Sequence, residues 1–501
     1  MVALASAGRT GNDEAPLGLW GAVGEARGAT VTDVLNAAPA LPGSPAVATP
    51  PEEERRRVAR LFARAGFGAG VDEIDRAAAK GYGATVDELL AFPPASTRPD
   101  ELTALSLETG APATESAAFS MSPYQRWWLD RMAATRWPLE EKLTLYWHNH
   151  FATGFSKVRR PKAMLAQNRL LRDHAGGNFR ELCKAITADA AMLIWLDGNT
   201  NQKIKPNENY GREFMELFTL GRDRYTQEDV RQAARAFTGY TTDGQGKALY
   251  HKELHDDGDK TILGNTGKWA GDDVADIVLD HHPEGAVAAH YVAARLAGFL
   301  YRPDPEPAVV EAMAAAFLAA DYDIKAMVKA LLLRPEFSDG PGLTIKSPAE
   351  YVAGTMRLLH LTVAPTPPSQ PQPRRREFDE MVKACNDMSQ ELFEPPNVAG
   401  WKGGAAWANT AATLARYNFS ARAGKLVTDN AVRTVLDAAA GEPRDTAPLW
   451  MHRLGLLSLL PSTEAALSKY LDASTAAKTD PGVRTRGVLT LLLASPDFNL
   501  R

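Results

Sequence analysis

Residues 291–299 have the sequence Tyr-Val-Ala-Ala-Arg-Leu-Ala-Gly-Phe, and residues 312–320 have the sequence Ala-Met-Ala-Ala-Ala-Phe-Leu-Ala-Ala. In both stretches apolar residues recur at i, i+3 and i+4, and the alternation typical of strands is absent. The same helical spacing begins after Pro51, where three glutamates open a segment that ends at Gly66. We therefore expect a mainly α protein, a large multi-helix domain with long loops.

Local composition divides the chain into segments of different expected structure. Residues 1–50 are rich in Ala, Gly and Pro and cannot bury enough apolar area to fold, so we expect a disordered or extended tail. We expect residues 51–501 to form a single large helical domain. The proline-rich segment 363–376 is a clear internal loop and could mark a break between sub-domains. Short strands that could pair as a small β-hairpin are expected around residues 248–263.

Composition and missing motifs exclude several function classes. The 501 residues carry 56 Lys and Arg against 61 Asp and Glu, so a net charge of −5 gives no electrostatic reason to expect a nucleic-acid partner. No apolar run reaches the roughly 18 residues of a membrane span. A P-loop, GxGxxG, HExxH and serine elbow are all missing from the sequence. Cys183 and Cys385 are too far apart for a CxxC site, and we expect two free buried thiols.

A first candidate site ends the helix predicted to start at Pro138, where residues 147–151 are Trp-His-Asn-His-Phe. If the helix continues, His148 and His150 project roughly 200° apart at about 100° per residue. They could then bind one metal only if the helix ended near Trp147. One interpretation makes His150 a core histidine and His148 a polar surface group. The other makes both imidazoles line a site, as metal ligands or proton carriers.

A second candidate site is the helix predicted between an N-cap at Asn207 and a stop at Gly221. Five polar residues fall within about 140° of its helical wheel: Glu208, Asn209, Arg212, Glu213 and Glu216. This pattern is typical of any partly exposed amphipathic helix. Alternatively, the three carboxylates line a cleft, where the arginine keeps one ionised while burial or like charge raises the pKa of another. Acid/base chemistry requires that split.

Turn and capping signals surround this helix. The segment Asp197-Gly198-Asn199 is first of all a turn, and Trp195 before it is either a core residue or a stacking platform. Thr226 and Asp229 have the spacing of a capping box that opens the next helix.

The ordered motifs resemble a known family. They are Trp-His-Asn-His-Phe at 147–151, the 207–221 helix, the polar loop 255–264, Lys-Ser-Pro at 346–348, Pro-Pro-Asn-Val-Ala-Gly-Trp at 395–401 and Arg-Tyr-Asn-Phe at 416–419. Together they resemble the bacterial family of unknown function numbered 1800, over roughly residues 53–501. The resemblance implies a large helical protein, often exported to the periplasm or the outside, whose gene often neighbours that of a sulfatase-like protein. That protein is a candidate partner. No signal peptide is visible in this sequence, so its localisation stays open.

The leading hypothesis is a hydrolase of a polar polymer, most simply a glycoside hydrolase acting on a polysaccharide. Such enzymes need two carboxylates and no cofactor; oxygens about 5–5.5 Å apart favour retention and about 6.5–9.5 Å inversion. Glu208 and Glu213 would be the catalytic pair. Arg212 and Glu216 would tune that pair, and Asp189 or Asp197 could replace one member because residues five apart face one sugar poorly. The other predicted site residues are His148 and His150 in the same pocket, with Asn149, Trp195, Asp197, Asn207 and Asn209 on the substrate.

Two alternatives remain open. In the first, His148, His150 and a glutamate bind a divalent metal for hydrolytic or oxidative chemistry. In the second, the chain is a non-catalytic helical binding or assembly partner of an exported protein. The second predicts that Glu208→Gln and Glu213→Gln fold normally and leave partner capture intact.

Overall fold

The computed structural model describes residues 50–94, 97, 121–243, 246–282, 284, 286–340, 344–361 and 375–501. Most of the tail expected over residues 1–50 lies outside these ranges. So does the proline-rich segment expected over residues 363–376, except for its last two residues, which begin helix α20.

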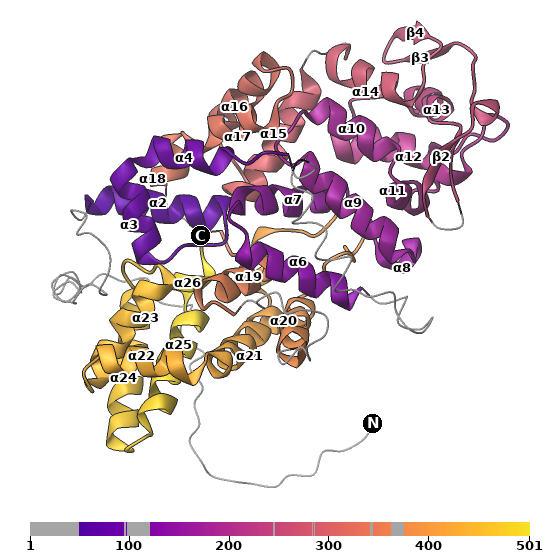
Figure 1. Ribbon diagram of the computed structural model, residues 1–501. Helices are drawn as coiled ribbons and strands as arrows, with labels where there is room; N and C mark the ends of the chain where they lie inside the picture. The colour runs from indigo at the N-terminus through magenta and orange to yellow at the C-terminus, as the bar shows by residue number, and fades with distance from the viewer. Residues whose placement is uncertain are drawn as a thin grey trace, which may run out of the picture.

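Helix α7 (Pro138–His150) runs through the middle of the molecule (Figure 1). Its proline in the first turn, followed by two glutamates, favours a helix start there. Every residue of α7 except Asn149 is buried. The other helices of the N-terminal part are α2 (Glu52–Ala65), α3 (Val71–Lys80), α4 (Tyr82–Leu90), α6 (Ser122–Ala134), α8 (Phe155–Val158) and α9 (Pro161–Asp173).

The next segment carries short helices and two small sheets, at the upper right of Figure 1. Its helical elements are α10 (Phe179–Thr187), α11 (Ala190–Trp195), η3 (Gly198–Thr200), α12 (Glu208–Glu213), η4 (Phe214–Thr219), α13 (Gln227–Ala236), η5 (Lys252–Leu254) and α14 (Gly271–Asp280). Strand β1 (Tyr240–Thr242) pairs with β2 (Ala248–Tyr250), and β3 (Lys260–Ile262) with β4 (Asn265–Gly267), both antiparallel. The strands expected around residues 248–263 are therefore β2 and β3, but each pairs with a different neighbour.

The remaining regular elements of the described chain are helices joined by loops, which confirms the mainly α class. The first four are α15 (Val287–Leu300), α16 (Pro307–Ala319), α17 (Ile324–Leu332) and α18 (Pro335–Asp339). The last are α19 (Pro348–Leu358), α20 (Arg375–Asp387), η6 (Gly404–Ala408), α21 (Thr410–Leu426), α22 (Asp429–Ala438), η7 (Pro443–Asp445), α23 (Thr446–Leu454), α24 (Pro461–Ala476), α25 (Pro481–Ala494) and α26 (Pro496–Asn499). Helices α20 to α26 lie below α7 in Figure 1.

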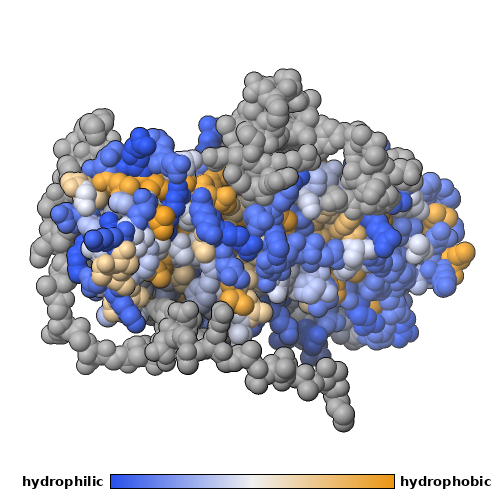
Figure 2. Space-filling model, turned by 90° about the horizontal axis from the view of Figure 1, so that it is seen from below, coloured by the Kyte–Doolittle hydropathy of each residue, from blue (hydrophilic) through white to orange (hydrophobic). Residues whose placement is uncertain are grey.

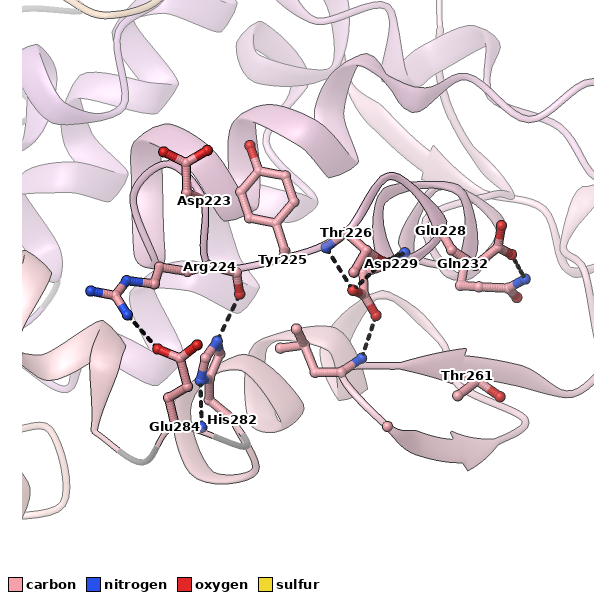
Figure 3. A pocket seen from close by; sticks show the side chains of 12 residues that line it. Asp223, Arg224, Tyr225, Thr226, Glu228, Asp229, Gln232, Thr261, His282 and Glu284 are labelled. Atoms are coloured by element: carbon pink, nitrogen blue, oxygen red, sulfur yellow. Dashed lines mark hydrogen bonds and ion pairs between the residues drawn. The ribbon is translucent and has the colours of Figure 1, made fainter.

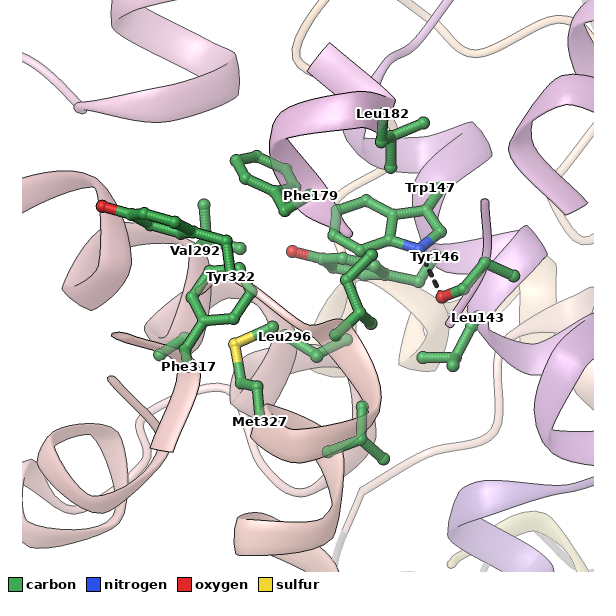
Figure 4. Packing of buried hydrophobic residues seen from close by; sticks show 14 of the residues in the cluster. Leu143, Tyr146, Trp147, Phe179, Leu182, Val292, Leu296, Phe317, Tyr322 and Met327 are labelled. Atoms are coloured by element: carbon green, nitrogen blue, oxygen red, sulfur yellow. Dashed lines mark hydrogen bonds between the residues drawn. The ribbon is translucent and has the colours of Figure 1, made fainter. Parts of the chain in front are cut away.

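Two clusters of buried apolar side chains form the core, and α7 contributes to both. Leu143, Tyr146 and Trp147 of α7 lie in the first cluster (Figure 4), where the Trp147 indole also donates to the Ala175 carbonyl at 3.0 Å. Leu145, on another side of α7, lies in the second cluster with the C-terminal helices. A helix buried on all sides organises both halves of the chain.

Both cysteines are free and buried, as expected, one in each apolar cluster. Among the described residues on the face shown in Figure 2, most are hydrophilic, with smaller hydrophobic patches between them. In the described part of the chain, no helix has the length and apolar character to cross a membrane.

The buried charges of α7 are paired. Glu141 accepts hydrogen bonds from Arg172 at 2.6 Å, from the Trp128 indole at 3.0 Å and from Arg131. Burial by itself would raise the pKa of Glu141, but Arg172 and Arg131 outweigh it and lower the pKa to about 2. The carboxylate is thus ionised inside the core, held by two guanidinium groups.

Candidate functional site

The helix that carries the predicted carboxylates begins at its expected cap. The Asn207 side chain accepts from the Asn209 amide at 2.9 Å, and Gly221 follows the last turn with φ +84°. The expected single α-helix is corrected in its second half, because α12 continues as the π-helix η4. There the Leu220 amide donates to the Met215 carbonyl, five residues earlier, at 2.8 Å.

Two side chains from other helices bind the carbonyls of this π-helix. The Tyr291 hydroxyl of α15 donates to the Leu217 carbonyl at 2.9 Å, and the His150 Nε2 of α7 lies 2.9 Å from the Phe218 carbonyl. Because a carbonyl only accepts, Nε2 carries the proton. The last carbonyls of a helix lack donors within the helix, and these two contacts supply hydrogen-bond donors to two of them. π-Helical turns are frequent at functional sites.

Glu208, at the start of α12, is engaged by its neighbours. It forms an ion pair with Arg212 at 3.1 Å and accepts from the Gln227 amide at 2.7 Å. Arg212 in turn donates to Gln227 at 2.8 Å. Both charged side chains are 37% exposed, so this pair is weak and accessible to solvent.

Glu213 and Glu216 are two partly buried carboxyl groups further along the same helix. Glu216 accepts from the Tyr225 hydroxyl and from Arg222, each at 2.9 Å. Burial and the negative charge of Glu216 raise the pKa of Glu213, while Arg212 and Arg222 oppose the shift. Burial and the hydrogen bond to Glu216 raise the pKa of Tyr225 as well. The neighbour that acts on Glu213 as a like charge is therefore Glu216, three residues away.

A polar pocket of about 680 Å³ is lined in part by the segment that follows η4 (Figure 3). Tyr225 lines the pocket and also donates to Glu216, so it connects the two. The Asp229 carboxylate binds the Thr226 backbone and side chain, which completes the expected capping box, and the Leu263 amide at 2.7 Å. The full lining is Asp223, Arg224, Tyr225, Thr226, Glu228, Asp229, Gln232, Thr261, Leu263, Gly264, His282 and Glu284.

The two histidines of the first candidate site diverge, because α7 continues through His150. His148 is only 1% exposed, so the expectation of a polar surface group is wrong. Its ring contacts Trp128, Phe393 and Trp401, and its Nε2 accepts from the Phe393 amide at 3.2 Å. Burial lowers the pKa of His148 to about 3, so the ring is neutral at neutral pH.

His150 is a core histidine, as one interpretation predicted. It is 1% exposed and packs against the rings of Phe151, Phe179 and Phe218. Burial and, to a smaller extent, Arg295 lower the pKa of His150 to about 3. His150 reaches the carboxylate helix at Phe218, through the backbone carbonyl and the aromatic ring of that residue.

Asn149 joins two sequence motifs that lie about 250 residues apart. Its Oδ1 accepts from the Trp401 amide at 2.6 Å, and its Nδ2 lies 3.5 Å from the Trp401 carbonyl. Gly400 packs directly against Asn149 with φ +78°. Together with the His148 contact, these bonds fix the loop from Phe393 to Trp401 on the end of α7. The amide predicted to contact substrate thus binds the protein's own backbone; the paired motifs were visible in the sequence, but their contact was not.

The other predicted contact residues lie near the start of α12. Asp197 forms an ion pair with Lys157 at 2.8 Å, and its carbonyl lies 3.5 Å from Asn207 Nδ2. Asn209 Nδ2 donates to the Leu196 carbonyl at 3.2 Å. Trp195, half-buried, packs against Gly154.

Asp189, predicted as an alternative carboxylate partner, instead caps α11. It accepts from the Met192 amide and from Gln167, both at 2.8 Å, and burial raises its pKa to about 7.

The structure therefore gathers Asp197, Asn207, Asn209 and Glu208 at one end of α12, with Glu213 and Glu216 further along. It places His148 and Asn149 against the 393–401 loop instead. Over the described ranges, the chain holds no group of three or more His, Cys, Asp or Glu side chains able to bind a metal ion.

The family model described as a protein of unknown function (DUF1800) matches residues 60–500, and the chain belongs to this family. The motifs at 147–151, 207–221 and 395–401, which carried the resemblance, all fall inside the matched range. No curated protein and no solved structure matches the chain significantly.

Proposed function

We propose that this member of the family is a hydrolase of a polar polymer, most simply a glycoside hydrolase, with Glu213 as the general acid and Glu216 as its ionised partner. The observation that supports it is the raised pKa of Glu213, caused by burial and by the neighbouring Glu216. In this proposal Glu216 takes the place of Glu208 as the catalytic partner of Glu213, because Glu208 is engaged by Arg212 and Gln227.

The two carboxyl groups suit the two roles. A general acid must keep its proton near the working pH, which a raised pKa allows, so that Glu213 can protonate the leaving oxygen. Glu216 accepts hydrogen bonds from Tyr225 and Arg222, which stabilise a carboxylate. In that form it can activate water or attack the anomeric carbon.

The neighbouring pocket suits a polyhydroxylated ligand. Its lining offers carboxylates, an amide, hydroxyls and an imidazole, and Tyr225 stands between the pocket and Glu216. Sugars are bound by such hydrogen-bonding groups, and a hydrolase of this kind needs no cofactor. A sugar unit in the pocket would place its neighbour close to the acidic pair.

The test measures release of reducing ends from a panel of neutral and acidic polysaccharides by four proteins: wild type, Glu213→Gln, Glu216→Gln and Glu208→Gln. Glu208→Gln is the matched control, since it makes the same chemical change on the same helix. We expect Glu213→Gln and Glu216→Gln to lose about 100-fold or more, the range of general acid–base catalysis, and Glu208→Gln to stay within a few-fold of wild type. Equal activity in all four proteins, or no release by any, would overturn the proposal.

The second candidate is a non-catalytic helical partner of an exported protein. It is favoured by the contacts of His148 and Asn149, which hold the 393–401 loop and do not line the polar pocket. Under this hypothesis, Glu208→Gln and Glu213→Gln both fold normally and retain capture of a sulfatase-like partner in a co-purification experiment. Loss of capture in either folded variant would contradict it.

A further inference from the structure

Five charged side chains from separate segments meet in the C-terminal half of the core. Lys142 belongs to α7, Glu350 to α19 and Arg416 to α21; Lys346 precedes α19, and Arg501 follows α26. All are buried, with exposed fractions between 0% for Lys142 and 8% for Lys346. Four of the five are basic, so the cluster holds an excess of buried positive charge, which is costly to desolvate.

The single carboxylate of this cluster is already used. Glu350 pairs with the Lys142 ammonium and, at 3.4 Å, with Arg501, and it accepts from the Ser347 amide at 2.7 Å. Arg416 donates instead to the Asn499 side chain at 2.9 Å and to the Lys346 carbonyl at 2.6 Å. The single negative charge of Glu350 is therefore shared between Lys142 and Arg501, and the carboxylate forms no ion pair with Lys346 in the described part of the chain.

The amine of Lys346 has no acceptor of its own in the described part of the chain. Its Nζ lies 4.1 Å from the centre of the Phe498 ring. An ammonium buried without a hydrogen-bonding partner loses its hydration and gains little in return. Burial lowers the pKa of Lys346 to about 7, with Lys142, Arg501 and Arg416 adding to the shift and Glu350 opposing it.

We propose that Lys346 is a nucleophilic amine that forms an imine with a small anionic carbonyl compound. The amine supplies the nucleophile, as in lysines activated beside other cations in an apolar site. The net positive charge of the cluster, which holds four basic groups and one carboxylate, attracts the carboxylate of such a compound, and the 8% exposure of Lys346 restricts entry to small molecules. The Lys-Ser-Pro motif at 346–348, which the proposed hydrolase does not use, thus acquires a chemical role.

The step is balanced and needs no cofactor. The nitrogen lone pair attacks the carbonyl carbon, a proton moves from nitrogen to the resulting alkoxide, and loss of water leaves the C=N bond. At pH 7, about half of an amine with a pKa near 7 is unprotonated, against roughly 1 in 3,000 for an ordinary lysine. The free-base fraction of Lys346 is therefore about 1,500-fold higher than that of exposed lysines.

The test treats the intact folded protein with glyoxylate and sodium cyanoborohydride at pH 7, and maps carboxymethyl-lysine by mass spectrometry. We expect Lys346 to be labelled well ahead of the exposed Lys203 and Lys205, which serve as internal references. Its labelling rate should level off above pH 8, while theirs still rises towards pH 10. Because the measurement uses the wild-type chain, it does not depend on a variant folding.

Two results would overturn the proposal. Lys346 labelled no faster than Lys203 and Lys205 at pH 7 would show that its amine is not a reactive free base. A large rise in unfolding temperature with inorganic phosphate or sulfate, without labelling of Lys346, would show a permanently charged lysine neutralised by a bound anion. Lys346→Arg provides the assignment control, since it keeps the charge and removes the reactive amine.

Discussion

Replacing Gly400 by alanine should destabilise the protein through the contact between the 393–401 loop and α7. A Cβ at position 400 would overlap both the side-chain oxygen and the backbone carbonyl of Asn149, and the residue has φ +78°. The left-handed conformation costs a non-glycine residue roughly 1–2 kcal/mol, and overpacking costs typically 1–3 kcal/mol. We expect a loss of about 2–5 kcal/mol in the free energy of unfolding.

Gly403→Ala is the matched control, because Gly403 lies three residues along the same chain and has φ −82°, and a Cβ added there would meet no atom within 4 Å. It should change the free energy of unfolding by less than about 0.5 kcal/mol. The assay is urea denaturation followed by tryptophan fluorescence, comparing midpoints at equal slope. Equal midpoints for Gly400→Ala and Gly403→Ala would refute the reasoning that Asn149 and Gly400 fix this loop on α7.

Three further outcomes follow from the same structure. Glu141→Gln should lower the free energy of unfolding, measured by urea denaturation, by about 3–5 kcal/mol, because Arg172 would stay buried without its carboxylate. Glu88→Gln, in an exposed ion pair, is the control and should lower it by less than about 0.5 kcal/mol. Equal losses in the two variants would contradict this reasoning. The pKa of Asp189 rises from 3.8 to about 7 on folding, so folding binds a proton and wild-type stability should fall between about pH 4 and 7. Asp189→Asn keeps the helix cap but cannot ionise, so the loss of unfolding free energy between about pH 4 and 7 should be smaller in this variant by up to roughly 4 kcal/mol. An unchanged pH profile would contradict the pKa shift. The raised pKa of Glu213 gives the same sign: stability should fall as pH rises above about 4.5, and Glu213→Gln should lessen that fall.

Local signals in the sequence were sufficient to predict many helix ends. Asn207, the Thr226–Asp229 box and Pro138 lie where they were expected, because caps and first-turn prolines act within a few residues. The apolar periodicity of residues 207–221 also predicts the buried face of this helix, where Tyr210, Phe214 and Phe218 are buried.

The π-turn and the role of the histidine motif could not be predicted in the same way. The π-turn accepts hydrogen bonds from Tyr291 and His150, which belong to helices remote in sequence. Likewise, His148 and Asn149 are polar residues whose partners lie about 250 positions away, on the backbone of Phe393 and Trp401. Helical periodicity describes one element at a time, so it contains no information on such partners.

The acidic pair illustrates the same limit. The sequence indicated that one carboxyl group of the 207–221 helix could have its pKa raised, and in the structure burial and the charge of Glu216 favour such a shift at Glu213. It did not show which carboxylate would act on it, because Tyr225 and Arg222 fix Glu216 from the loop that follows.

The most direct test of the acidic pair is a carbon-13 NMR titration of the Glu213 carboxyl group in the wild-type protein and in Glu216→Gln. We expect a pKa clearly above the ordinary value of 4.5 in wild type, and a lower pKa in Glu216→Gln, since the variant removes a negative charge that disfavours ionisation of Glu213. An ordinary pKa for Glu213 in wild type, or the same pKa in both proteins, would contradict the account.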